Sequence, residues 1–125
     1  MPELVSYYQQ RFASNHVWFE CANIATDSLP DAQLCLLRQV LQHLSNAENR
    51  CVLTNVRQNS NVLISEHVPI HPRCFNRDKT HGPDIRAYFG SGVYPDREPF
   101  SQRADRVWET PLELDSRLRT VLLRY

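Results

Sequence analysis

Residues 61–68 read NVLISEHV, and their side chains alternate between two faces along the whole stretch. One face carries Val62, Ile64, Glu66 and Val68. Because successive side chains of a strand point to opposite faces, the pattern predicts a strand covered on one side and partly buried on the other. The preceding residues Arg50–Val56 (RCVLTNV) alternate as well, and RQNS between them supplies turn residues. The two segments therefore predict a β-hairpin.

Two helices are predicted before this hairpin. Apolar residues at helical spacing predict a helix from Asp31 to about Ser45; they are Leu34, Leu37, Leu41 and Leu44. A shorter helix is predicted over Pro2–Phe12, where proline occupies the first turn and apolar residues share one face. Between them, His16–Ala25 is rich in strand-forming residues, which predicts a strand.

The sequence changes character after the hairpin. Residues 69–99 contain five prolines and all three glycines, which predicts a loop-dominated region interrupted by a strand at Asp84–Phe89. Ala104–Thr110 is compatible with a strand or a helical turn. Apolar residues on one helical face predict a final helix over Leu112–Tyr125, with a strand over Arg119–Tyr125 as the competing interpretation.

These elements predict an α+β fold. We expect a mainly antiparallel sheet with two or three helices packed on one face, and a long irregular loop between the central hairpin and the C-terminal third. A length of 125 residues fits a single domain, residues 1–125. The N-terminus lacks the basic and apolar regions of a secretory signal, and no apolar run approaches the ~20 residues that span a bilayer. We therefore expect a cytoplasmic protein that engages no membrane and keeps its cysteines reduced.

Arginine dominates the basic residues of this chain. The formal net charge is zero, which argues against a strongly basic nucleic-acid binder. All the basic residues except Lys79 are arginines, and arginine suits bidentate contacts with carboxylate or phosphate and stacking on aromatic rings. Between residues 73 and 108 the arginines interleave with aromatic residues on loop-rich sequence. The candidate binding residues are Arg73, Arg77, Arg86, Tyr88 and Arg97.

This pattern favours a small regulatory or binding module. We expect it to engage a protein or a single-stranded nucleic acid through the surface of residues 66–108. The sequence contains no nucleotide-binding glycine motif and no nucleophile turn. A structural assembly subunit is a further possibility, which an exposed apolar helix face would indicate.

Metal-dependent hydrolysis is the alternative function. The possible ligands His67, His71, Cys74 and His81 lie within one short segment. Zinc takes nitrogen and sulfur ligands, so this set is competent to hold zinc or another divalent metal. The stretch EHVPIHP is similar to the segment before the metal loop of HNH-type nucleases, without the glycines and paired cysteines that follow it there. The resemblance implies metal-assisted hydrolysis of phosphodiesters.

Overall fold

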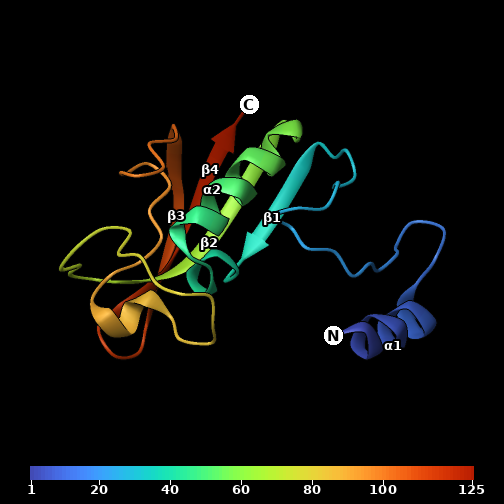
Figure 1. Ribbon diagram of the computed structural model, residues 1–125, viewed down its shortest axis with the longest axis horizontal. Helices are drawn as coiled ribbons and strands as arrows, with labels where there is room; N and C mark the ends of the chain where they lie inside the picture. The colour runs from blue at the N-terminus through green and yellow to red at the C-terminus, as the bar shows by residue number, and fades with distance from the viewer.

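A four-stranded mixed sheet forms the centre of the fold in the computed structural model, which describes residues 1–125 (Figure 1). In chain order the helices and strands are α1 (Pro2–Phe12), β1 (Leu34–Arg38), α2 (Asn46–Asn55), β2 (Asn61–Pro69), β3 (Ala104–Leu112) and β4 (Ser116–Arg124). The strands lie in the order β1-β2-β4-β3, so β1 and β3 are the two edges. Short 3-10 turns occur at Leu41–His43, Val56–Gln58 and Arg86–Phe89.

The predicted α+β class is confirmed, and the sheet is mainly antiparallel. β2 pairs with β4, and β4 with β3, in antiparallel fashion. The exception is β1, which runs parallel to β2. This parallel pairing is possible because the chain between β1 and β2 crosses over through α2, as parallel neighbours require.

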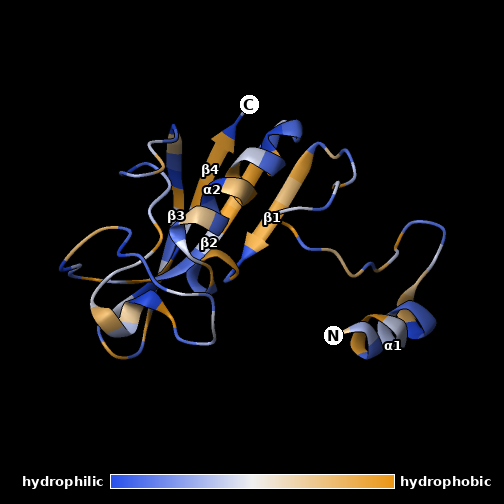
Figure 2. Cartoon of the chain, in the orientation of Figure 1, coloured by the Kyte–Doolittle hydropathy of each residue, from blue (hydrophilic) through white to orange (hydrophobic).

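The central strand β2 behaves as its alternation predicts. Val62, Ile64, Glu66 and Val68 are buried, and the residues between them are half-buried. α2 and part of the loop around residues 93–100 cover the buried face and form one apolar core with it. That core also contains Leu37 of β1 and Val121 and Leu123 of β4. Figure 2 shows the apolar character of β1, β2 and β4 behind α2.

The predicted helix over Asp31–Ser45 is wrong. Residues 34–38 form β1, in which Leu37 points into the core and Leu36 is exposed. A dense run of leucines satisfies both the helical period and the strand period, so the sequence alone does not separate them. Pairing with β2 selects the strand, and Gln39 then adopts a left-handed backbone, with φ of 54°, that ends it.

The first half of the predicted hairpin is also wrong, because residues 46–55 form α2. Ser45 begins this helix with a capping box: its hydroxyl accepts from the backbone N–H of Glu48, and the Glu48 carboxylate accepts from the backbone N–H of Ser45 at 2.8 Å. The long loop therefore lies between strand β2 and strand β3. The S-x-x-E signature of this box is present in the sequence at Ser45–Glu48, where the predicted helix over Asp31–Ser45 ends.

Three smaller predictions have mixed outcomes. The segment His16–Ala25 is irregular rather than a strand, and Asp84–Phe89 contains the 3-10 turn over Arg86–Phe89. The final segment is strand β4, which confirms the competing interpretation over the helix. α1 has its predicted bounds, yet none of its residues is buried, and it stands apart from the sheet (Figure 1). Only α2 therefore packs on the sheet, and neither helix is long and apolar enough to cross a membrane.

Candidate functional site

Asn76 fixes the shape of the long loop between β2 and β3. It is buried, and its backbone is left-handed with φ of 51°, a conformation that asparagine tolerates better than most residues. Its amide nitrogen donates to the carbonyls of Tyr94 at 2.9 Å and Glu98 at 2.8 Å, and its amide oxygen accepts from the N–H of Tyr94 at 2.7 Å. One side chain thus holds residues 73–77 against residues 94–98.

Further hydrogen bonds join residues 73–77 to residues 90–92. The N–H of Arg73 donates to the carbonyl of Gly90 at 2.7 Å, and the N–H of Asn76 donates to the carbonyl of Gly92 at 3.2 Å. The N–H of Arg77 donates to the Ser91 hydroxyl at 3.0 Å. Residues 73–77 and 90–92 therefore lie side by side, although they belong to an irregular part of the chain.

This pairing gathers arginines and aromatic rings on one surface. We define the Arg/aromatic surface as the exposed residues Arg73, Phe75, Arg77, Tyr88, Phe89 and Arg97. The Arg77 guanidinium lies 5.3 Å from the ring centre of Phe89, and the Arg97 guanidinium lies 4.9 Å from that of Phe75. Both distances are within the range of cation–π contacts. The ring of Tyr88 is 72% exposed and stacks on no other ring, and it lines a separate cleft with His67 and residues 111–114.

The arginines of this surface are largely free of carboxylate partners. Arg73 and Arg77 form no ion pair, and Arg97 has only the carboxylate of its neighbour Asp96, at 3.9 Å. The nearby Asp78 is engaged elsewhere, because it accepts from the backbone N–H of Asn46 at 2.8 Å, at the start of α2. That hydrogen bond lowers the pKa of Asp78, so the carboxylate stays charged and bound to the helix.

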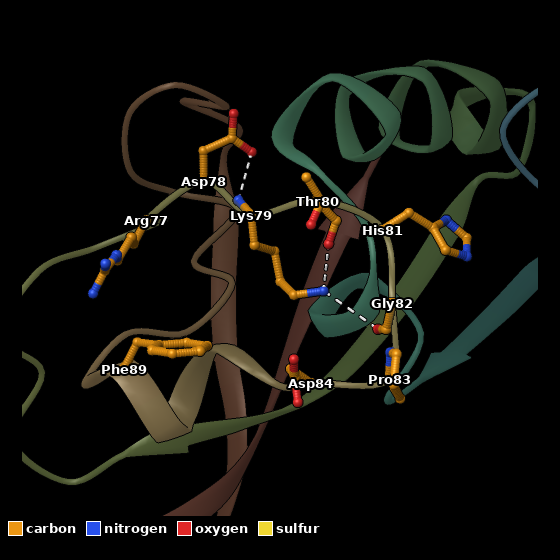
Figure 3. A pocket seen from close by; sticks show the side chains of 9 residues that line it. All are labelled: Arg77, Asp78, Lys79, Thr80, His81, Gly82, Pro83, Asp84 and Phe89. Atoms are coloured by element: carbon orange, nitrogen blue, oxygen red, sulfur yellow. Dashed lines mark hydrogen bonds between the residues drawn. The ribbon is translucent and has the colours of Figure 1, made fainter.

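A polar pocket of about 300 Å³ adjoins the surface and shares Arg77 and Phe89 with it (Figure 3). Lys79 crosses this pocket, and its ammonium donates to the carbonyls of His43 at 3.2 Å, Thr80 at 2.7 Å and Gly82 at 3.3 Å. The only lysine of the chain therefore acts as a clamp on its own loop, because its three N–H groups already have acceptors.

Arg86 does not belong to the surface, contrary to the sequence-based expectation. It is 1% exposed, and its guanidinium donates to the side chain of Asn46 and to the carbonyls of Arg77 and Leu44 at 2.6 Å. Burial lowers the pKa of Arg86, while Asp78 and Glu66 oppose this effect. Arg86 thus joins the long loop to the start of α2 and is not available to a partner.

Glu66 forms a second buried polar centre beneath the loop. Its carboxylate accepts from the backbone N–H groups of Val40 at 3.1 Å, Leu41 at 2.9 Å and Gln42 at 3.2 Å. These donors start the 3-10 turn that follows β1. Burial raises the pKa of Glu66 to about 7, against the opposing effect of the three donors and of the Arg86 charge.

The four candidate metal ligands lie apart. His67 is half-buried on β2, beside a cleft that Tyr88 and residues 111–114 also line. His71 and Cys74 are exposed, and the Nδ1 atom of His81 lies 2.9 Å from the carboxylate of Glu48. No group of three or more His, Cys, Asp or Glu side chains is arranged to hold a metal ion. The candidate binding residues of the Arg/aromatic surface therefore remain as the candidate functional site.

Phe75 and Phe89 organise this surface and are not among the candidate binding residues predicted from the sequence. They belong to the interleaved Arg/aromatic pattern, but only their contacts with Arg97 and Arg77 show their role. An Arg-x-Phe-x-Arg spacing over residues 73–77 is the signal that could have singled out Phe75.

No known protein family, curated protein or solved structure matches this chain.

Proposed function

We propose that this protein is a small binding module that engages an anionic macromolecule through the Arg/aromatic surface. The observation that carries the proposal is the pair of stacked arginines, Arg77 on Phe89 and Arg97 on Phe75, beside Arg73, with no strong carboxylate partner for any of them. A guanidinium held against a ring loses less rotational freedom when it binds phosphate or carboxylate.

The exposed rings favour single-stranded nucleic acid over an acidic protein segment. Unpaired bases stack on aromatic side chains, and each such contact contributes roughly 1–3 kcal/mol. Tyr88 offers a free ring face, and Phe75 and Phe89 remain 46% and 44% exposed. A zero net charge is compatible with this role, because the required positive charge is local rather than spread over the molecule.

Fluorescence anisotropy with labelled single-stranded oligonucleotides tests the proposal. The variant carries Arg73→Gln, Arg77→Gln and Arg97→Gln, all at exposed positions, so the fold should persist. Loss of three phosphate contacts should lower the slope of log K against log salt by about 2. Replacing Tyr88 with Ala should weaken binding at every salt concentration.

A matched control removes the same charge elsewhere. Arg38, Arg50 and Arg103 are exposed and unpaired, and their replacement with Gln should leave binding nearly unchanged. An acidic peptide is titrated in parallel. Binding of the peptide but not of the oligonucleotides would assign the surface to a protein partner. Equal affinity of the two triple variants would refute the surface itself.

A further inference from the structure

The sheet has a second face that no helix of the chain covers. α2 packs on one side only, so the other side of the sheet carries the half-buried and exposed residues. Leu36, Leu63 and Leu122 stand in register across β1, β2 and β4 and form one apolar row on this open face. Leu36 is 66% exposed, and Trp108 on the edge strand β3 is 54% exposed. An apolar row across three strands is typical of a surface that is covered in the working protein.

The N-terminal helix presents the complementary surface. Leu4, Tyr8 and Phe12 follow one another at a spacing of four residues and form an apolar stripe along α1. Each of them is between 38% and 51% exposed, and Figure 2 shows apolar residues on a helix that touches no other layer. Because isolated helices of this length are marginal in water, α1 requires a surface to stabilise it.

The helix belongs to a folded arm that leaves the domain on the covered side. Phe19 stacks on Tyr8 with ring centres 5.7 Å apart, and its N–H donates to Gln9 at 2.8 Å, so residues 1–19 form the arm. The chain is then fixed to α2, where the Asn55 amide donates to the carbonyls of Ile24 and Asp27, each at 2.8 Å. Only residues 20–23 connect the arm to this anchor.

This short connection directs the arm to another molecule. From Phe19 to Ile24 the chain makes five Cα–Cα steps, which span at most about 18 Å. Passing from the α2 layer to the open face of the same sheet requires two layer spacings of roughly 10 Å each. We therefore propose that α1 of one copy docks on the open sheet face of a second copy. The α1 helix of the second copy docks in the same way on the first, which gives a two-fold symmetric dimer.

The available area suits such a dimer. An aromatic side chain offers on the order of 150–250 Å², and about half of that is exposed at Tyr7, Tyr8, Phe12 and Trp18. Counting helix and sheet at both reciprocal sites, the exchange buries on the order of 1,200–1,600 Å². That value reaches the range of stable specific interfaces, roughly 1,200–2,000 Å². The dimer would also present two Arg/aromatic surfaces to one extended partner.

Analytical ultracentrifugation of the full chain, from micromolar to near-millimolar concentration, tests the exchange. We expect a doubling of mass with increasing concentration. Two variants should each remain monomeric: the arm variant Leu4→Ser with Phe12→Ser, and the face variant Leu36→Ser with Leu122→Thr. Gln10→Ala, on the polar side of α1, should dimerise normally. Circular dichroism checks that each variant keeps the fold, and the arm variant removes no buried contact.

Mixing the two defective variants gives a sharper result. In an exchange, the intact arm of the face variant fits the intact face of the arm variant, so the mixture should form a weak heterodimer although neither variant self-associates. A monomeric wild-type chain at every concentration would overturn the proposal and assign the open face to a foreign partner. A dimer that survives the arm variant would also overturn it and indicate direct sheet-to-sheet packing.

Discussion

Replacing Glu66 with Gln is the most informative perturbation of this fold. Glu66 is 2% exposed, and its two carboxylate oxygens accept three backbone N–H groups at the turn after β1. A glutamine of the same shape keeps one acceptor oxygen and places an NH₂ group against the N–H of Gln42. The buried N–H that loses its acceptor destabilises the fold by roughly 1–3 kcal/mol.

The effect depends on pH, and its sign follows from the pKa of Glu66. Burial raises this pKa from the ordinary 4.5 to about 7, so between these values the folded chain binds more protons than the unfolded chain. The free energy of unfolding therefore falls as pH rises through this window. A pKa difference of about 2.5 corresponds to a loss of about 3 kcal/mol from the acidic to the alkaline side. Gln does not titrate and escapes this loss.

The expected outcome is a stability difference that changes with pH. Near pH 5 the Gln variant should be the less stable of the two, and near pH 8 the difference should vanish or reverse. Urea unfolding followed by circular dichroism at several pH values measures it, and subtraction of the two curves cancels the five histidines. The exposed Glu113→Gln change serves as the matched control. A constant difference across the range would refute the reasoning and show that Glu66 stays ionised, held by its backbone donors and Arg86.

Three further changes test the local structure. Arg86→Met should destabilise the fold by about 3–5 kcal/mol in urea unfolding, because it leaves three part-buried acceptors without a donor; a loss below ~1 kcal/mol would contradict this. Ser45→Ala should cost about 1 kcal/mol through loss of the capping box, whereas Ser6→Ala on the exposed α1 should cost nothing measurable. Gly90→Ala should cost about 1–2 kcal/mol, since φ is 70° and the new Cβ would lie 2.9 Å from Arg73. Gly82→Ala meets no atom and is its control; equal melting temperatures would reject the argument.

The sequence predicted those elements in which the apolar residues follow a single periodicity and lie on a single face. β2 has clean alternation over its whole length, so its burial pattern follows directly. The leucines of residues 34–44 are compatible with both periods, and a contact with β2 decided between them. For α2 the local signal was present, because Ser45 and Glu48 have the spacing of a capping box. The capping box is a stronger signal than the alternation of residues 50–56, because a helix with one buried side can produce a similar pattern of apolar and polar residues.

The chemical character of the candidate site could be predicted from the sequence, but not which of its arginines are exposed. Arginines and rings within one charged, glycine- and proline-rich segment indicated a surface, and Arg73, Arg77 and Arg97 do lie on it. Arg86 has the same neighbours in sequence and is buried.

Arg86 differs from the other three arginines because it makes contacts with residues that are distant in the sequence. Its acceptors include the carbonyl of Leu44 and the side chain of Asn46, about 40 residues away at the start of α2. The predicted helix over Asp31–Ser45 does not start a helix at Asn46, so the sequence pattern gives no reason to expect these acceptors near Arg86. The error at residues 31–56 therefore propagated into the site, since the position of α2 decides which arginine the interior takes and which three remain for a partner.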